Sequence, residues 1–265
     1  MSPSPAGWMA IRLTVLGSGS GGNATLIEGG GVRILLDAGF SCRRLVQRLR
    51  FVGCEPDTID ALLITHEHAD HVAGAARFSL SFEAPIWCTR GTARAAGFER
   101  DGLDVRPVAA GQAFAIGDLA VRPFAVPHDA AETVGFVLEA GRSRLGYATD
   151  LGHGPDSVRE QLAECDLLVL ESNHDVDLVR GGPYPEALKT RILSRHGHLD
   201  NQSAADLLCA VAGGRTRTVV LAHLSETNNR PSLALEAAGR RLAAGGAAPR
   251  LHAAAQATPS PWFEA

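Results

Sequence analysis

The stretch ITHEHADHVAG, residues 64–74, places three histidines, a glutamate and an aspartate within six positions. It continues the apolar run ALLIT (61–65), which predicts a buried β-strand. Loops that follow strands are where α/β proteins place their chemistry. A solvated polar loop is the alternative interpretation, but the spacing His-x-His-x-Asp-His seldom arises by chance. We therefore interpret the stretch as the centre of a metal site.

The backbone around this motif can direct its ligands toward two separate ions. His66 and His68 lie two residues apart, so an extended chain points both side chains to one side. Asp70 and His71 lie at the turn into a helix expected over residues 71–78, and they can approach the same space from another direction. Imidazole and carboxylate groups are ligands that zinc, manganese and iron accept.

Further candidate ligands follow other apolar runs: His128 comes after VRPFAVP, Asp150 ends GYATD, and His223 ends TVVLAH. One such residue alone more often has an ordinary structural role, but three of them beside the histidine motif favour a shared site. The full prediction is two divalent metal ions (Zn, Mn or Fe), one on His66, His68 and His128, the other on Asp70, His71 and His223, with Asp150 bridging. Two ions about 3.5–4 Å apart can hold a hydroxide that attacks phosphorus or carbon.

The composition of the chain limits its location and partners. Its 265 residues are 45% hydrophobic and carry a formal charge of −4, which argues against a generally basic nucleic-acid coat but permits a local basic groove. No apolar run is long enough for a transmembrane helix, so we expect no membrane association. The five scattered cysteines without a CxxC pair indicate reduced thiols in a cytoplasmic protein. Residues 1–9 are expected to be a disordered lead-in that is not a signal peptide, and residues 10–265 a single domain.

Periodicity and turn residues predict how strands and helices alternate along the chain. Strands are expected over residues 11–16, 24–28, 32–39, 61–65, 85–89, 119–126, 133–139, 144–149, 166–171 and 217–223. Helices are expected over residues 41–50, 71–78, 92–96, 185–194, 201–212 and 232–243. Each half begins with a strand meander and continues as strand, loop and helix, which favours two sheets between outer helices. The tail from Ala253 is expected to be loose.

This order of motifs resembles the metallo-β-lactamase superfamily, over nearly the whole chain from Ile11 to Ala255. The resemblance implies an α/β fold of αββα type, with two mixed β-sheets flanked by helices. Six further motifs are similar to the YycJ group, also called WalJ or VicX: LGSGSGGNATLIE (16–28), LLDAGFSCRRL (35–45), YATDLG (147–152), LVLESNHD (168–175), GPYPEALKTRILSRHGHLDN (182–201) and LAHLSETNN (221–229). That group implies a metal-dependent hydrolase with 5′-to-3′ exonuclease activity on double-stranded DNA.

Asp70 and His198 are the predicted catalytic residues. In related nucleases, a histidine in the region of His198 contacts the scissile phosphate or protonates the leaving oxygen, so we expect His198 to do either. The resemblance also implies that Asp37 holds the histidine loop by hydrogen bonds instead of binding metal.

Other polar residues are candidates for substrate binding. His174 follows the apolar strand DLLVLE and is expected either to contact substrate or to orient a metal ligand. Ser18, Ser20 and Asn23 lie in a glycine-rich loop that can present N–H groups to a phosphate, although a tight strand connection explains them equally well.

Three functions remain compatible with the sequence. The first is a DNA phosphodiesterase, which would bind DNA through a local basic groove. Arg43, Arg44, Arg48 and Arg50 are candidates for that groove, or else form an ordinary solvated helix face. The second is a hydrolase of a small cyclic phosphodiester, thioester or lactone, because no inserted domain is evident that would clamp a polymer. The third is a regulator without catalysis, against which the complete ligand set argues.

Overall fold

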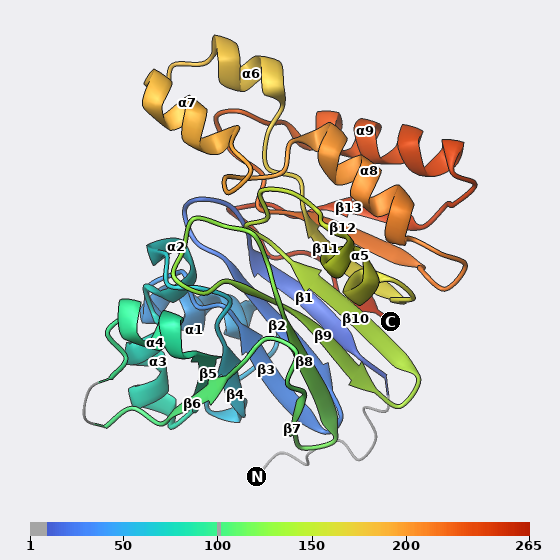
Figure 1. Ribbon diagram of the computed structural model, residues 1–265. Helices are drawn as coiled ribbons and strands as arrows, with labels where there is room; N and C mark the ends of the chain where they lie inside the picture. The colour runs from blue at the N-terminus through green and yellow to red at the C-terminus, as the bar shows by residue number, and fades with distance from the viewer. Residues whose placement is uncertain (1–9, 100–101) are drawn as a thin grey trace.

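The structure is a computed structural model that describes residues 10–99 and 102–265. The lead-in expected over residues 1–9 therefore lies outside the described residues. Two seven-stranded sheets form the centre of the fold (Figure 1). The first sheet contains, in spatial order, β14 (Phe263–Glu264), β1 (Arg12–Gly17), β2 (Ala24–Gly29), β3 (Val32–Leu36), β4 (Ala61–Leu63), β5 (Ile86–Thr89) and β6 (Val105–Val108). The second contains β13 (Arg250–Ala253), β12 (Thr218–Ala222), β11 (Leu167–Glu171), β10 (Ser143–Ala148), β9 (Val134–Ala140), β8 (Leu119–Ala125) and β7 (Phe114–Ile116).

Both sheets repeat one topology. In the first, β1, β2 and β3 pair antiparallel, and β4, β5 and β6 then add in parallel. In the second, β7 to β10 pair antiparallel, and β11, β12 and β13 add in parallel. The meander followed by strand, loop and helix that the sequence predicts in each half is thus confirmed, and the three strands that follow each meander are parallel. Parallel strands end at one edge of a sheet, which brings the loops after them together.

The parallel strands are buried on both faces. Along β11, Leu167 and Val169 pack between the sheets, whereas Leu168 and Leu170 pack on the opposite face under helices. Because successive side chains of a strand alternate between faces, a fully apolar strand needs a cover on each side. The fold is therefore the expected αββα sandwich, in which helices cover the outer face of each sheet (Figure 1).

The helices complete both outer layers and the connections between strands. In chain order they are α1 (Cys42–Phe51), the short 3-10 helix η1 (Pro56–Thr58), α2 (Ala69–Val72), α3 (Ala75–Phe82), α4 (Arg90–Ala95), α5 (Asp156–Leu162), α6 (Val176–Gly181), α7 (Glu186–Ile192), α8 (Asn201–Val211) and α9 (Pro231–Ala244). None of these helices has both the length and the apolar character needed to cross a membrane, within the part of the chain that the structure describes.

The continuous helix predicted over residues 71–78 is wrong, because two helices, α2 and α3, meet at Gly74. The backbone N–H of Gly74 donates a hydrogen bond to the carbonyl of Ala38 at 2.8 Å. A Cβ at this position would lie 2.2 Å from the carbonyl oxygen of Phe40. Only glycine fits so close to another segment of backbone, and this contact fixes the histidine loop against the loop after β3.

The loose tail predicted from Ala253 is also wrong. Residues 250–253 form β13 at the edge of the second sheet, and β14 pairs antiparallel with β1. Phe263 lies opposite Leu13 and is 3% exposed, so its ring is part of the core between the sheets. The tail thereby covers the edge of β1, and the buried ring of Phe263 adds to the hydrogen bonds between Ser260 and β1 that hold it there.

Helices α6 and α7 lie in the long connection between β11 and α8 and stand apart from the two outer layers (Figure 1). None of the seven residues of α7 is buried. The two helices are tied together by Lys189, whose ammonium donates a hydrogen bond to the carbonyl of Arg180 at 2.9 Å. α7 therefore contributes little to the core of the sandwich.

Candidate metal centre

Three polar residues at strand ends have a left-handed backbone. Asp37 follows β3 with φ 59°, Asp150 follows β10 with φ 57°, and His223 follows β12 with φ 55°. Positive φ is uncommon for residues other than glycine, although Asp and His tolerate it better than most. Such strain concentrates at functional sites, where the surrounding fold maintains it. Here it turns all three side chains into the space between the loops.

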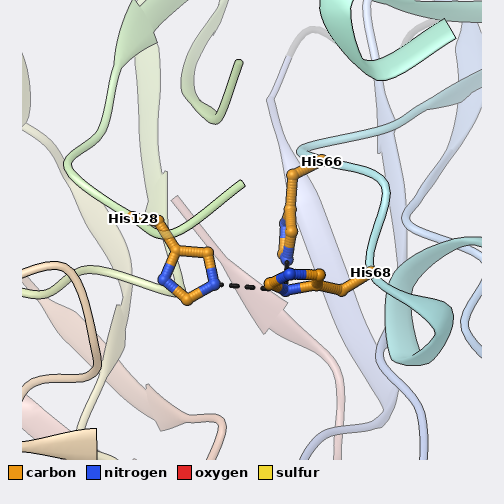
Figure 2. A group of neighbouring side chains, drawn as sticks. All are labelled: His66, His68 and His128. Atoms are coloured by element: carbon orange, nitrogen blue, oxygen red, sulfur yellow. Dashed lines mark hydrogen bonds between the residues drawn. The ribbon is translucent and has the colours of Figure 1, made fainter. Parts of the chain in front are cut away.

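His66, His68 and His128 form the first group of candidate ligands (Figure 2). Nε2 of His66 lies 3.0 Å from Nδ1 of His68, and Nε2 of His128 lies 3.3 Å from the same atom. Burial, together with the neighbouring imidazoles, lowers the pKa of His66 well below its usual value and also lowers the pKa of His128. Neutral imidazoles with nitrogens converging on one point are what a metal ion requires.

The other ring nitrogens of His66 and His128 are held by the protein. Nδ1 of His128 lies 3.1 Å from the carbonyl of Gly197, which can only accept, so this nitrogen carries the proton. Nδ1 of His66 contacts the hydroxyl of Thr65 at 3.0 Å. These contacts fix the orientation of both rings and leave Nε2 of each facing the site.

Asp70, His71 and His223 form the second group. Nε2 of His223 lies 3.3 Å from Oδ2 of Asp70, and Nε2 of His71 lies 3.7 Å from the same oxygen. Nδ1 of His71 is held at 2.8 Å by Oδ2 of Asp37, whose Oδ1 also accepts a hydrogen bond from the backbone N–H of Thr65 at 2.9 Å. The expectation that Asp37 holds the histidine loop by hydrogen bonds is confirmed.

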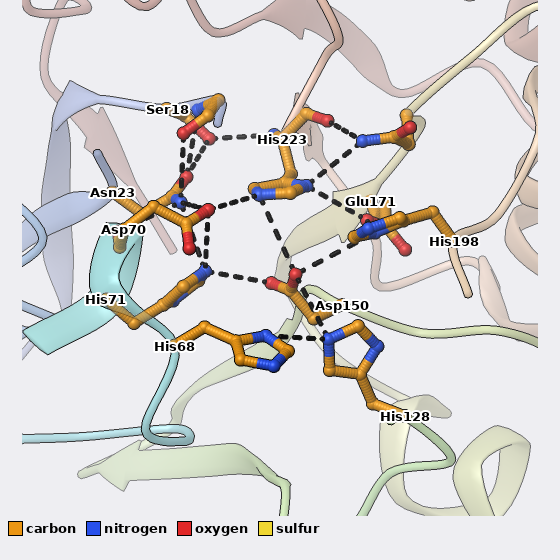
Figure 3. A network of polar contacts seen from close by, with 12 residues as sticks. Ser18, Asn23, His68, Asp70, His71, His128, Asp150, Glu171, His198 and His223 are labelled. Atoms are coloured by element: carbon orange, nitrogen blue, oxygen red, sulfur yellow. Dashed lines mark hydrogen bonds and ion pairs between the residues drawn. The ribbon is translucent and has the colours of Figure 1, made fainter. Parts of the chain in front are cut away.

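Asp150 lies between the two groups (Figure 3). Its carboxylate oxygens are 3.1 Å from Nε2 of His71, 3.6 Å from Nε2 of His223 and 3.7 Å from Nε2 of His128. Burial would raise the pKa of Asp150, but the imidazoles of His223, His71 and His66 hold it well below its usual range. Oδ2 of Asp150 is buried and makes no hydrogen bond of normal geometry among the described residues.

This arrangement fits two divalent cations. Within each group the candidate ligand atoms lie within 4.8 Å of one another. The buried carboxylate of Asp150 faces imidazole nitrogens of candidate ligands, and a divalent cation between these groups would compensate its charge. Donor sets of imidazole nitrogen and carboxylate oxygen suit zinc, manganese and iron alike. The structure brings together all seven predicted ligands, and their coordination of metal stays a prediction.

Glu171 is a central residue that the sequence reasoning missed. Its fully buried carboxylate lies 2.8 Å from Nδ1 of His198 and 3.1 Å from Nδ1 of His223 (Figure 3). The other oxygen accepts hydrogen bonds from the backbone N–H groups of Leu151 at 2.8 Å and Leu199 at 3.1 Å. Burial would raise the pKa of Glu171, but His198, first among its partners, lowers it to about 2. A charged residue closing the apolar strand DLLVLE is the signal that could have revealed it.

The three candidate residues of the glycine-rich loop lie in different surroundings, two in the interior and one at the surface. Ser18 and Asn23 are buried, and the hydroxyl of Ser18 accepts a hydrogen bond from the backbone N–H of His223 at 2.7 Å. The side-chain amide of Asn23 contacts the carbonyl of Asp70 at 3.3 Å. Both residues therefore brace the metal-binding loops, whereas Ser20 is exposed and lines the cleft above them.

His198 and His174 occupy different surroundings. His198 lines the cleft, and its ring stacks at 5.1 Å on that of His223. His174 is 1% exposed and is not among the described residues that line the cleft. Its Nδ1 lies 3.3 Å from the side-chain oxygen of Asn173, whose amide nitrogen contacts Nδ1 of His223 at 3.1 Å. This chain of contacts favours an orienting role for His174, and a substrate contact there stays a prediction.

The cleft has a volume of about 410 Å³ and opens above the two groups. Candidate metal ligands form its floor, and Tyr184 together with residues of α7 forms one wall. The described lining residues are Ser20, His68, Ala69, Asp70, Asp150, Asn173, Tyr184, Leu188, Arg191, Ile192, Gly197, His198, His223 and Ser225. A volume of this order suits one small ligand or one unit of a polymer.

The arginine-rich helix α1 does not contribute to this cleft. Arg48 is buried, and its guanidinium donates hydrogen bonds to the carbonyls of Leu16 and Gln256 and lies 4.2 Å above the ring of Phe40. For Arg48 both predicted roles, phosphate contact and solvated helix face, are therefore wrong. A buried guanidinium with carbonyl acceptors stabilises the packing of α1 on β1.

Comparisons with known proteins identify the family and the fold of this chain. A family model described as a Beta-lactamase superfamily domain matches residues 32–224. The chain is 31% identical over 231 residues to the exodeoxyribonuclease WalJ of Streptococcus pneumoniae, covering 85% of this chain and 86% of that protein. It is 32% identical over 231 residues to the exodeoxyribonuclease YycJ of Bacillus anthracis, covering 85% and 87%. The metallo-beta-lactamase fold protein YhfI from Bacillus subtilis matches with a TM-score of 0.74 and 15% identity over 97% of this chain and 100% of its own, a similarity of fold.

Proposed function

Since this chain belongs to the beta-lactamase superfamily and, within it, to the group of the exodeoxyribonucleases WalJ and YycJ, we propose that it is a hydrolase that uses two divalent metal ions to degrade DNA from a 5′ end. The observation that carries the proposal is the convergence of seven candidate ligands in two groups, four of which (His68, Asp70, Asp150 and His223) line one cleft. The similarity to two exodeoxyribonucleases over 85% of this chain supports DNA as the substrate.

In this proposal, His66, His68 and His128 hold one ion, Asp70, His71 and His223 hold the other, and Asp150 bridges them. When bound, two such ions supply an activated water and neutralise negative charge on a phosphate. The position of Asp70 at the floor of the cleft supports its predicted role at the reacting group. Zinc, manganese and iron all satisfy this donor set.

His198 is the proposed general acid. It lines the cleft with its Nδ1 held by Glu171, so its Nε2 is the nitrogen left to face a substrate. Burial would lower the pKa of His198, but the carboxylates of Glu171 and Asp150 raise it above its usual value. A protonated imidazole can donate to the leaving oxygen of a nucleotide, whose departure as an alkoxide is slow without a proton.

The remaining parts of the proposal concern the chain as a whole. Residues 10–265 act as one domain, because both sheets contribute ligands to one site. All five cysteines are free thiols, which supports a reducing compartment such as the cytoplasm.

The experiment that tests this function compares two substrates and two proteins. Wild type and Asp70→Ala, each loaded with Mn²⁺ or Zn²⁺, are incubated with linear duplex DNA and with bis-p-nitrophenyl phosphate. We expect wild type to hydrolyse both substrates and Asp70→Ala to hydrolyse neither. Hydrolysis of the small diester alone would replace DNA by a small-molecule substrate. Failure of the metal-loaded wild type on both substrates would reject a phosphodiesterase.

A further inference from the structure

Tyr184 and residues of α7 form one wall of the cleft, and this wall offers contacts to a substrate that the metal centre does not provide. Of the described residues that line the cleft, Arg191 has the only permanently positive side chain. Every phosphate of a DNA strand carries a negative charge, and the cleft floor contains the carboxylates of Asp70 and Asp150. An incoming strand therefore finds its fixed cationic contact on α7.

The guanidinium of Arg191 is held by one hydrogen bond, which leaves its other N–H groups available to a ligand. Its Nε donates a hydrogen bond to Oδ2 of Asp129, the residue after the candidate ligand His128. The other N–H donors of this guanidinium have no partner among the described residues. The two side chains are 55% and 30% exposed, and ion pairs that open to solvent contribute little stability. A phosphate can therefore engage Arg191 at little cost.

Tyr184 supplies a flat surface on the same wall. It lines the cleft, is half-buried, and its hydroxyl makes no hydrogen bond with the described residues. Pro183 and Pro185 flank it and restrict the backbone on both sides. A backbone restricted in this way loses little freedom on binding, and base stacking on aromatic side chains is a common way to hold single strands.

The packing of α7 agrees with a binding role. None of its residues is buried, and its half-buried apolar side chains, Leu188 and Ile192, line the cleft. A helix that fills no core has another reason to keep apolar residues on one face. Here that face completes the wall between Tyr184 and Arg191.

We propose that Arg191 and Tyr184 form a strand clamp, in which Arg191 binds the phosphate next to the scissile one and Tyr184 stacks on a base. This inference rests on the proposed nuclease function and deepens it. Arg191 is more than half exposed at the rim, whereas the candidate ligands that would hold the reacting phosphate are at the floor. The clamp therefore acts on a polymer and not on a small diester.

The test measures kcat and KM of five metal-loaded variants on linear duplex DNA and on bis-p-nitrophenyl phosphate. Arg191→Gln is expected to raise KM for DNA about tenfold, to reduce its salt dependence by about one counterion, and to change the small-diester kinetics less than about twofold. Tyr184→Ala is expected to raise KM for DNA by about tenfold, whereas Tyr184→Phe retains wild-type KM because the ring remains. Arg195→Gln is the matched control: this arginine lies four residues further on, outside the cleft, and its loss should leave both substrates unaffected.

Asp129→Asn distinguishes phosphate binding by Arg191 from a structural role of the Arg191–Asp129 ion pair. It breaks the same ion pair but keeps the arginine, so KM for DNA relative to the small diester should stay the same or fall. If Asp129→Asn raises this ratio as much as Arg191→Gln does, the ion pair is merely structural and the clamp is rejected. The clamp is also rejected if Arg191→Gln impairs both substrates equally, or if it leaves KM for DNA unchanged. Neither result contradicts the nuclease function. A wild type that spares DNA but cleaves the small diester rejects both proposals together.

Discussion

Oε1 of Glu171 lies 2.8 Å from Nδ1 of His198, whose ring lines the cleft. An ionised carboxylate can only accept, so Nδ1 of His198 carries the proton and Nε2 is directed to the substrate side. Glu171 is fully buried, and two backbone N–H groups fix its other oxygen. The pair thus has the form of a general acid with its orienting group.

The effect of replacing His198 on kcat should depend on the leaving group of the substrate. His198→Ala is expected to lower kcat on DNA by roughly 10²–10⁴-fold, because the leaving alkoxide needs a proton. Hydrolysis of bis-p-nitrophenyl phosphate should fall far less, because p-nitrophenolate leaves without protonation. Steady-state kinetics on both substrates measure the ratio. A similar loss on both would show that His198 binds metal or shapes the site and is not the acid.

Asp37→Asn should weaken metal binding without unfolding the protein. Asparagine tolerates the left-handed backbone at this position, but it no longer supplies the charge that holds Nδ1 of His71. Loss of such an orienting partner typically costs about 10–100-fold in metal affinity. Calorimetric titration of the metal-free protein with Zn²⁺ measures the change. Unaltered affinity for both ions would contradict the role assigned to Asp37.

Metal removal should release two ions per chain and lower the melting temperature. The two ligand groups predict a stoichiometry of two, which elemental analysis measures directly. At about 100 times the dissociation constant, a bound ion stabilises a fold by about 2.7 kcal/mol. For two such ions and a chain of this size, we expect a chelator to lower the melting temperature by roughly 10–20 °C. A single ion in the active protein would contradict the assignment of the second group.

Phe263→Ala should destabilise the fold but spare the chemistry. The ring is 3% exposed in the core between the sheets, and Phe-to-Ala changes in cores cost about 3–5 kcal/mol. Denaturant unfolding should show this loss, while kcat at a temperature where both proteins are folded stays near wild type. A loss below about 1 kcal/mol would mean that the tail makes no such contact in solution.

Much of this architecture follows from local sequence pattern. The apolar runs that end at His66, Asp150 and His223 identify strands, and strand ends in parallel sheets meet at one edge. Local pattern therefore groups the candidate ligands at one edge of the fold. This grouping depends only on short-range periodicity and on the residue types that metals accept.

Other features depend on contacts between distant segments, which local pattern does not encode. The pairing of β14 with β1 joins residues about 250 positions apart, and the buried position of Phe263 follows from it alone. Arg48 is buried because the carbonyls of Leu16 and Gln256 converge on it. The sequence shows Glu171 only as a charged residue at the end of an apolar strand. Its position between His198 and His223 follows from the pairing of β11 with β10 and β12 and from contacts with distant loops.

Hydrolysis of duplex DNA labelled at its 5′ or its 3′ end tests the central claim most directly. With Mn²⁺-loaded wild type, we predict that the 5′ label is released first as short products, while the 3′ label remains on progressively shorter strands. Covalently closed circular DNA should resist, and Asp70→Ala should leave every substrate intact. If metal-loaded wild type leaves linear DNA unchanged, or cuts circular and linear DNA alike, the assignment as a 5′-to-3′ exonuclease is contradicted.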